Sequence, residues 1–156
     1  RVLLDCMDIQ ANQRSLLDVG CGYGTLGVSL KKEYPWLHVE MVDVNERAVH
    51  LANQSCQYND VEDIKAYLSF AYENVVGTFD VIVSNPPIRA GKKVVFEILE
   101  KAFDFLNENG ELIVVIQKKQ GAPSAQKKMN EVFGNCEIIK RDKGYFILKS
   151  IRNTDF

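Results

Sequence analysis

Short apolar blocks separated by polar breaks run along the chain and predict alternating strands and helices. Mainly apolar runs that end at glycine, proline or acidic positions are typical of buried strands. Five such runs occupy Ser15–Val19, His38–Val42, Ile64–Phe70, Phe79–Ser84 and Glu111–Gln117. The fifth is apolar at every position from Leu112 to Ile116, as expected for a strand covered on both faces of a parallel sheet.

Apolar residues between these runs recur every three or four positions, which predicts amphipathic helices. The expected helices are Thr25–Glu33, Glu46–Tyr58, a helix with an apolar face from Val95 to Leu106, and Gln126–Phe133. Asn45 is placed to cap the second helix, and Asn109-Gly110 is placed to end the third. Residues 121–124 are expected to be a loop, and strands are expected at Cys136–Lys140 and Tyr145–Ser150.

Strand and helix alternate up to residue 133, and two strands then follow in succession. This order predicts an α/β fold that is Rossmann-like and doubly wound, with a mostly parallel seven-stranded sheet and a C-terminal antiparallel hairpin. The length of 156 residues suits one domain, so we expect a single domain over residues 1–156.

Charge is divided unevenly between the two halves of the chain. Residues 1–84 hold 6 basic and 12 acidic side chains, a net −6, whereas residues 85–156 hold 13 and 9, a net +4. A basic half suggests a polyanionic partner, although a solvated surface with chance clustering explains the charge equally well.

Membrane and metal binding are not expected. No apolar run approaches the roughly 20 residues that span a bilayer. The four cysteines, Cys6, Cys21, Cys56 and Cys136, form no CxxC pair, which argues against a metal cluster and for a reducing, cytoplasmic compartment. No feature of the sequence points to a particular oligomeric state.

The first predicted strand ends in a glycine turn, Asp18-Val19-Gly20-Cys21-Gly22-Tyr23-Gly24. Glycines at this place let the backbone and its N–H groups approach a ligand closely. The Asp18 carboxylate would repel a pyrophosphate, so a cationic or amine-bearing ligand is favoured. Asp43 ends the second strand, where a carboxylate can accept both ribose hydroxyls. A tight turn and a helix cap without any ligand are the structural alternative.

These residues resemble the signature of the class I S-adenosylmethionine-dependent methyltransferases. The resemblance implies S-adenosyl-L-methionine as the cofactor, with the glycine turn along its methionine part. It also implies that Asp43 holds the ribose and that Val44 packs on the adenine. The segment Ser69-Phe70-Ala71 lacks the acidic residue often found near the adenine, so Phe70 and backbone groups are expected there. The implied cofactor contacts are Asp18, Gly20, Cys21, Gly22, Gly24, Asp43, Val44 and Phe70.

The fourth predicted strand is followed by Asn85-Pro86-Pro87-Ile88, which resembles the acceptor motif of methyltransferases that modify a conjugated nitrogen. Such a nitrogen is a poor nucleophile because its lone pair is delocalised. Asn85 and the carbonyl of Pro86 can hydrogen-bond its two protons and orient it toward the methyl group. Pro87 would stiffen the backbone and Ile88 would offer an apolar face to a flat acceptor. These four residues are the expected catalytic residues, and a bare Asn-Pro turn is the alternative.

The loops at residues 84–92 and 117–124 narrow the resemblance to ribosomal RNA guanine-N2 methyltransferases of the RsmC type. This implies methylation of the exocyclic N2 of a guanine in small-subunit (16S) rRNA, by direct in-line displacement. It also implies ribosomal RNA or the small ribosomal subunit as partner. The upstream segment that helps close the family's site is expected to be lacking before residue 1. Basic residues suited to an RNA path are Arg89, Lys92, Lys93, Lys118, Lys119, Lys127 and Lys128.

Other activities stay open at this point. A protein-glutamine or DNA-adenine methyltransferase would share the Asn-Pro-Pro motif, although the basic half argues against a protein substrate and no DNA-reading domain is evident. A nicotinamide dehydrogenase would also use a glycine turn, but its spacing differs and no hydride-site His, Lys or Tyr is placed for it. A non-catalytic RNA-binding domain would keep the fold without the chemistry.

Overall fold

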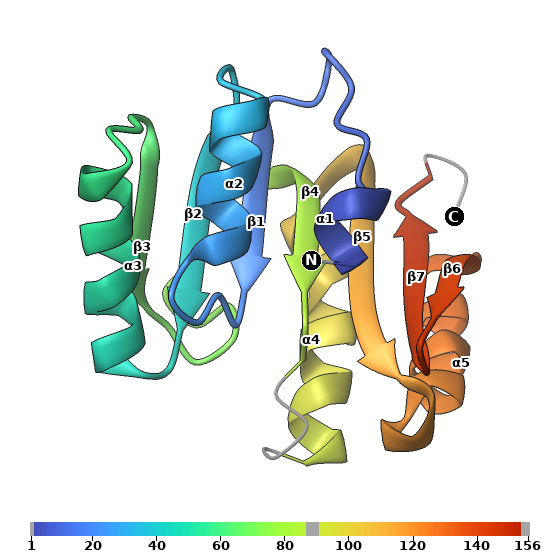
Figure 1. The fold of residues 1–156 in the computed structure, drawn as a ribbon. Helices are drawn as coiled ribbons and strands as arrows, with labels where there is room; N and C mark the ends of the chain where they lie inside the picture. The colour runs from blue at the N-terminus through green and yellow to red at the C-terminus, as the bar shows by residue number, and fades with distance from the viewer. Residues whose placement is uncertain (1, 87–90, 154–156) are drawn as a thin grey trace.

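A computed structural model describes residues 2–86 and 91–153 of the chain (Figure 1). Strands and helices alternate along most of it, as expected. The elements are α1 (Val2–Cys6), β1 (Ser15–Val19), α2 (Thr25–Glu33), β2 (His38–Asp43), α3 (Glu46–Tyr58), β3 (Ile64–Leu68), β4 (Phe79–Ser84), α4 (Lys92–Phe105), β5 (Leu106–Gln117), the short 3₁₀ helix η2 (Lys118–Gln120), α5 (Ala122–Phe133), β6 (Glu137–Asp142) and β7 (Tyr145–Ile151).

The strands form one seven-stranded sheet in the order β3-β2-β1-β4-β5-β7-β6. The pairs from β3 to β5 are parallel, and β7 is antiparallel to both of its neighbours. The expected fold, a mostly parallel doubly wound sheet with a C-terminal antiparallel hairpin, is confirmed. The last strand, β7, lies between β5 and β6, so that β6 is at the edge of the sheet (Figure 1).

Two apolar cores cover opposite faces of the sheet. Leu17 and Val19 of β1 belong to the core under α4 and α5, whereas Leu16 belongs to the core under α1, α2 and α3. Figure 1 shows α1 and α2 in front of the sheet and α4 and α5 behind it. Successive side chains of a strand alternate between faces, so Asp18 points to the same side as Leu16, toward α2.

β5 begins five residues earlier than expected, at Leu106 instead of Glu111. Leu106 is 1% exposed and pairs with Phe79 of β4, so the chain becomes extended as soon as α4 ends. The prediction that Asn109-Gly110 closes this helix is therefore wrong. Gly110 lies within the strand, where an added Cβ would be 3.2 Å from the carbonyl oxygen of Asp80.

α5 begins at Ala122, so the loop expected over residues 121–124 is mostly helix. Gly121 precedes it with a φ of 115°, and Pro123 fits the first helical turn because its missing N–H has no partner there. The sequence analysis also missed α1, whose Leu3 is 5% exposed. β3 ends at Leu68, so Phe70 follows the strand and is not part of it.

Candidate active site

A cavity of about 560 Å³ opens at the carboxyl ends of β1 and β4, on the sheet face covered by α1 and α2. Parallel sheets of this type bind their ligands at this edge. Two polar side chains reach the cavity from neighbouring strands, because Val19 pairs with Ser84 and so brings Asp18 and Asn85 together. The lining residues are Leu3, Leu4, Asp18, Gly20, Cys21, Thr25, Leu26, Ser29, Asn85, Val115 and Tyr145.

The glycine turn is tied to the neighbouring strand. Gly20 N and Cys21 N both donate to the carbonyl oxygen of Val42, at 2.9 and 3.0 Å, and Gly24 N donates to Cys21 O at 3.1 Å. Gly20, Gly22 and Gly24 all have a positive φ, which a side chain would strain. The N–H groups of Gly20, Cys21 and Gly24 are thus used inside the protein, and the expected approach of a ligand to the turn stays a prediction. What the turn offers is a close approach of its backbone.

Asp43 supports the turn with both carboxylate oxygens. Oδ2 accepts from Gly22 N and Oδ1 accepts from Asn45 N, each at 2.9 Å. Asn45 in turn caps α3 by accepting from Ala48 N at 3.1 Å, which confirms the predicted cap. Each carboxylate oxygen can accept a further hydrogen bond, so the ribose contact of Asp43 stays a prediction. The neighbouring Val44 is 64% exposed.

Asp18 is a buried acid whose side-chain carboxylate has no hydrogen bond to the described residues. Its side chain lines the cavity, and the residue is 4% exposed. Burial, together with the negative charge of Asp43, raises the pKa of Asp18 to about 7. A cationic group in the cavity would oppose both effects, because it stabilises the ionised carboxylate.

The end of β4 lies against the glycine turn. Ser84 Oγ donates to the carbonyl oxygen of Val19 at 2.9 Å. One residue further on, the carbonyl oxygen of Asn85 would be 3.7 Å from a Cβ placed on Gly20. Asn85 is exposed and lines the cavity, while Pro86 is buried beneath it. The acceptor motif and the glycine turn therefore share one cavity.

The structure brings together only part of the expected set. The expected residues that line the cavity are Asp18, Gly20, Cys21 and Asn85. Those that hold the glycine turn in place from outside the cavity are Gly22, Gly24 and Asp43, and Pro86 is buried. Pro87 and Ile88 lie outside the described residues, so their expected roles stay predictions.

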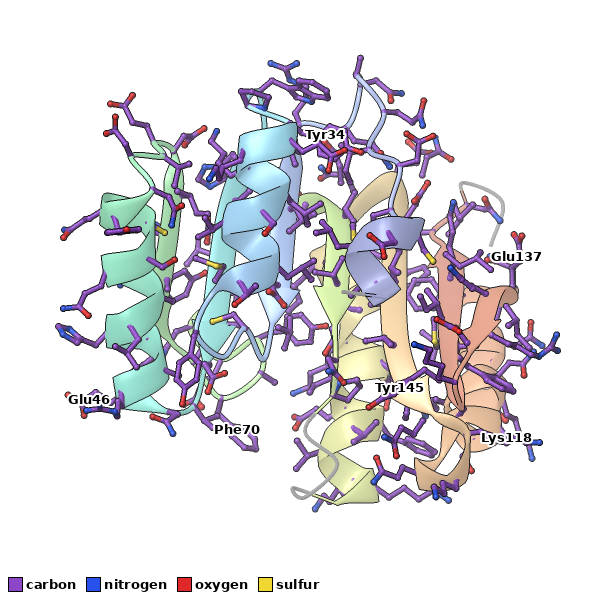
Figure 2. The ribbon with its side chains drawn as sticks, in the orientation of Figure 1. Tyr34, Glu46, Phe70, Lys118, Glu137 and Tyr145 are labelled. Atoms are coloured by element: carbon purple, nitrogen blue, oxygen red, sulfur yellow. The ribbon has the colours of Figure 1, made fainter. Side chains whose placement is uncertain are left out.

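Phe70 lies apart from this cavity. The loop that carries it is held to β2, because Ser69 N donates to Asp43 O at 3.1 Å. The Phe70 side chain is 49% exposed and lines a smaller cavity with Tyr72. Figure 2 shows Phe70 below β2 and β3, with Tyr145 further along the same edge of the sheet. Contact between Phe70 and adenine stays a prediction.

Several cavity residues were not predicted. Leu3 and Leu4 come from α1, and Val115 and Tyr145 come from β5 and β7. Val115 could have been found from strand alternation, because it lies two residues before the polar Gln117 at the carboxyl end of β5. Tyr145 carries no such local signal, because its position depends on where β7 enters the sheet.

No cysteine or metal chemistry is indicated in the described part of the chain. All four cysteines are free thiols. Burial and the charges of Asp18 and Asp43 raise the pKa of Cys21 above its usual range, so this thiol lines the cavity in its uncharged form. No group of three His, Cys, Asp or Glu side chains among residues 2–86 and 91–153 is placed to hold a metal ion. Within those same ranges, no helix has the length and apolar character needed to cross a bilayer.

Comparison with known proteins gives matches along the chain. The methyltransferase small domain family model matches residues 1–149. The "uncharacterized protein YbxB" of Bacillus subtilis is 46% identical over 152 residues, which cover 96% of this chain and 76% of that protein. The ribosomal RNA small subunit methyltransferase C of Aeromonas hydrophila is 39% identical over 111 residues, which cover 69% of this chain but 32% of that protein. The chain thus spans well under half of that second relative.

A solved structure shares the fold. It is that of the T. thermophilus 16S rRNA N2 G1207 methyltransferase (RsmC) in complex with AdoMet and guanosine. It superposes with a TM-score of 0.85 at 22% sequence identity, covering 97% of this chain and 42% of that one. At this identity the likeness is one of architecture.

Proposed function

Because the chain belongs to the methyltransferase small domain family, we propose that it methylates the exocyclic N2 of a guanine in small-subunit (16S) ribosomal RNA. Family membership makes the chain an S-adenosylmethionine-dependent methyltransferase and sets the nicotinamide dehydrogenase aside. The RNA, the guanine and the roles of individual residues are the proposed parts.

One observation carries the proposal: a buried carboxylate without a hydrogen-bond partner and an exposed amide face the same cavity. When bound, S-adenosylmethionine would supply a methyl group on a positively charged sulfur, and it also carries an ammonium group. Asp18 fits such a cation, because positive charge stabilises a buried carboxylate. The acceptor then belongs in the β4 half of the cavity, beside Asn85.

Asn85 would act by orientation and not as a base. Its side-chain oxygen and the carbonyl oxygen of Pro86 would each accept a hydrogen bond from one amine proton, which turns the nitrogen lone pair toward the methyl group. The amine nitrogen forms the new N–C bond in line as the S–C bond breaks. Its surplus proton leaves to water, because asparagine is neutral.

An RNA substrate is supported by the charge beyond the carboxyl ends of β4 and β5. Lys92 and Lys93 begin α4, Lys118 and Lys119 form part of η2, and all four are exposed. Figure 2 shows Lys118 at this edge of the molecule. Arg89 lies outside the described residues. A base within folded RNA would be turned out of its stack to reach Asn85.

Two of the expected basic residues contribute less to this surface. Lys128 is partly neutralised by Glu100, 3.5 Å away, and both Lys128 and Lys92 lie over the ring of Phe96. Lys127 is exposed on α5, further from the cavity-lining strands.

The net +4 of residues 85–156 favours a nucleic acid over the protein-glutamine alternative.

Methyl transfer from tritiated S-adenosylmethionine tests the substrate. Purified small ribosomal subunits, naked small-subunit rRNA, duplex DNA and ribosomal proteins are offered separately, and the product is digested to nucleosides or amino acids. We expect label in N2-methylguanosine from one of the two RNA samples. Label in N6-methyl-2′-deoxyadenosine from the DNA or in methylglutamine from the proteins would replace the proposal with one of the two alternative methyltransferases.

The Asn85→Ala variant tests the site. We expect near-normal cofactor affinity with methylation reduced about 100-fold or more, since positioning supplies several kcal/mol of a transfer barrier. Asn85→Asp is the matched control, because it keeps an acceptor oxygen at the same place, and it should retain more activity than the alanine variant. Full activity in Asn85→Ala would refute the role of this amide.

A further inference from the structure

A polar pair on the far side of the cavity has no role so far. The side-chain nitrogen Nε2 of Gln117 donates a hydrogen bond to the hydroxyl of Tyr145 at 2.8 Å. The two residues are partners in the β5–β7 register, so their side chains lie on the same face. The adjoining backbone is joined as well, because Lys118 N donates to Gly144 O at 2.8 Å. Tyr145 lines the cavity and is labelled at its edge in Figure 2.

Tyr145 and Asn85 lie on opposite sides of the cavity floor. β5 separates β4 from β7 in the sheet, and Val115 of β5 lines the cavity between them. Neighbouring strands are about 4.8 Å apart, so the β4 and β7 backbones are about 10 Å apart. A flat ring held by its amine at Asn85 would lie over Val115 and turn its far edge to Tyr145.

The hydroxyl of Tyr145 is arranged to donate a hydrogen bond into the cavity. Its oxygen accepts from Gln117, and it has no second partner among the residues that the structure describes. A hydroxyl that accepts one hydrogen bond becomes a stronger donor for the next. A donor at this place complements a carbonyl oxygen, and the bond from Gln117 already uses acceptor capacity of the hydroxyl oxygen.

We propose that Tyr145 recognises the C6 carbonyl oxygen of the acceptor guanine, with Gln117 as the residue that positions its hydroxyl. This inference rests on the proposed function, in which Asn85 holds the N2 amine. On guanine the C6 oxygen lies on the same edge as the amine, one ring nitrogen away from the carbon that bears it. That separation suits a donor on the far side of Val115.

The two other candidate acceptors, adenine and glutamine, fit the Gln117–Tyr145 pair poorly. Adenine has no exocyclic oxygen, and the ring nitrogens N1 and N7 flank the methylated amine closely. Its other six-membered-ring acceptor, N3, lies across the ring and not on the edge that guanine would turn to Tyr145. The Tyr145 hydroxyl is then left without a partner. On glutamine the carbonyl oxygen shares a carbon with the amide nitrogen, which has the same consequence. A site that leaves a polar group unpaired discriminates strongly against the wrong ligand. The Gln117–Tyr145 pair therefore selects guanine.

The test removes one group from each side of the proposed contact. The RNA segment around the methylated guanine, once mass spectrometry of nuclease fragments has located it, is synthesised with either guanine or 2-aminopurine at that position. 2-Aminopurine keeps the N2 amine and lacks the C6 oxygen. Tyr145→Phe removes the hydroxyl and keeps the ring, and Tyr58→Phe, at a residue 91% exposed on α3, is the matched control. The measured quantity is kcat/KM for methylation.

Tyr145→Phe is expected to lower kcat/KM about tenfold on the guanine RNA, the effect of one lost hydrogen bond, with no further loss on the 2-aminopurine RNA. Gln117→Met should act in the same direction and with the same base dependence, and Tyr58→Phe should match the wild type. Equal losses on both RNAs, or no loss on the guanine RNA, would overturn this inference and leave the proposed function intact. A wild-type chain that methylates guanine in no RNA would overturn both.

Discussion

Two carboxylates next to the glycine turn, those of Asp18 and Asp43, differ in their hydrogen bonds. Asp43 accepts from the backbone N–H groups of Gly22 and Asn45 at 2.9 Å each. The Asp18 carboxylate is buried and accepts no hydrogen bond from the described residues, and its pKa is raised to about 7 by burial and by the charge of Asp43. Asp18 in the free protein therefore changes its charge near neutral pH.

We expect the affinity for S-adenosylmethionine to rise with pH through 7. The cation binds the ionised form of Asp18, and about a tenth of that carboxyl is ionised at pH 6 if its pKa is about 7. The Kd at pH 6 should therefore be about tenfold weaker than at pH 8. Isothermal titration at both pH values measures this. Asp18→Asn should bind more weakly at pH 8 and lose the pH dependence, and a slope that survives in the variant would contradict the assignment.

The cavity-lining residues that the sequence revealed are those at the carboxyl ends of strands that are neighbours in the sheet. Asp18, Gly20 and Asn85 could be predicted because parallel strands end at one edge and each of these residues follows an apolar run. Tyr145 could not be predicted in this way. Its partner Gln117 is 28 residues away, and the contact exists only because β7 pairs with β5.

At the scale of elements, periodicity located the helices and strands, and tertiary contacts decided their ends. The bounds of β1, α2, α3 and β4 agree with the expected ones. α4 and β5 differ because Leu106 is drawn into a ladder with Phe79, a contact that no local pattern contains. Gly110 looked like a helix terminator, whereas it is a strand residue that leaves room for the carbonyl of Asp80.

Alanine at two glycines of the turn separates backbone strain from packing. Gly22 and Gly24 have φ values of 57° and 85°, so alanine strains either one by about 1 to 2 kcal/mol. A Cβ at Gly24 would lie 3.0 Å from the Cβ of Ala52 in α3, whereas one at Gly22 has nothing within 4 Å. We expect Gly24→Ala to lower the free energy of unfolding by about 1 kcal/mol more than Gly22→Ala. Urea unfolding without cofactor measures the difference. Equal losses in the free energy of unfolding would show that α3 shifts to accommodate the added methyl group without a cost in stability.

A histidine joins β2 to the segment before β3. His38 Nδ1 is 2.7 Å from Asp63 Oδ1, His38 Nε2 is 2.7 Å from Glu40 Oε2, and Tyr67 donates to Glu40 at 2.6 Å. Partial burial lowers the pKa of His38, but hydrogen bonds to Glu40 and Asp63 outweigh it and raise the pKa above 6.5. The charged histidine therefore stabilises the folded state fully below pH 6.5, and this contribution is lost as the pH rises through the folded-state value.

We expect the stability difference between wild type and His38→Asn to be larger at pH 6 than at pH 9. Urea unfolding at the two pH values measures it, and comparison with the variant cancels the separate pH dependence that Asp18 brings. His50→Asn, on the exposed surface of α3, is the matched control and should show no such difference. A His38→Asn effect that is the same at both pH values would contradict the ion-pair assignment.

At the scale of the whole molecule, the basic half of the sequence supplies the lysines beyond β4 and β5. If Lys118 and Lys119 contact RNA phosphates, each contact releases counterions and contributes about 0.7 to 0.9 to the slope of log K against log salt. The double variant Lys118→Gln/Lys119→Gln should bind RNA more weakly, with a slope shallower by up to about 1.8. Filter binding over a range of salt concentrations measures this.

Lys32→Gln serves as the control for that experiment. Lys32 lies in the last turn of α2, where its Nζ is 3.3 Å from Asn59 Oδ1, at the end of the helix away from the cavity. Its replacement should leave the salt slope unchanged. An unchanged slope in the Lys118/Lys119 variant would show that RNA approaches the molecule elsewhere.

The topology was predictable except for the order of the last two strands. Alternation of strand and helix dictated a parallel sheet, and the turn before Tyr145 dictated a hairpin. Which hairpin strand meets β5 depends on burial. Ile147 and Leu148 of β7 are fully buried on opposite faces, whereas Ile138 and Ile139 of β6 are half-buried, so β7 takes the inner position.

That inner position bears on how the protein is made. β6 precedes β7 along the chain, yet within the described residues β7 is its sole strand partner. During translation, residues 137–142 therefore have no strand to pair with until residues 145–151 have been synthesised. Synthesis proceeds at about 5 to 20 residues per second. The contact between Gln117 and Tyr145 forms at the same stage, when β7 pairs with β5. On the roles proposed above, a nascent chain released before that point would have the cofactor half of its pocket without the residues proposed to recognise the base.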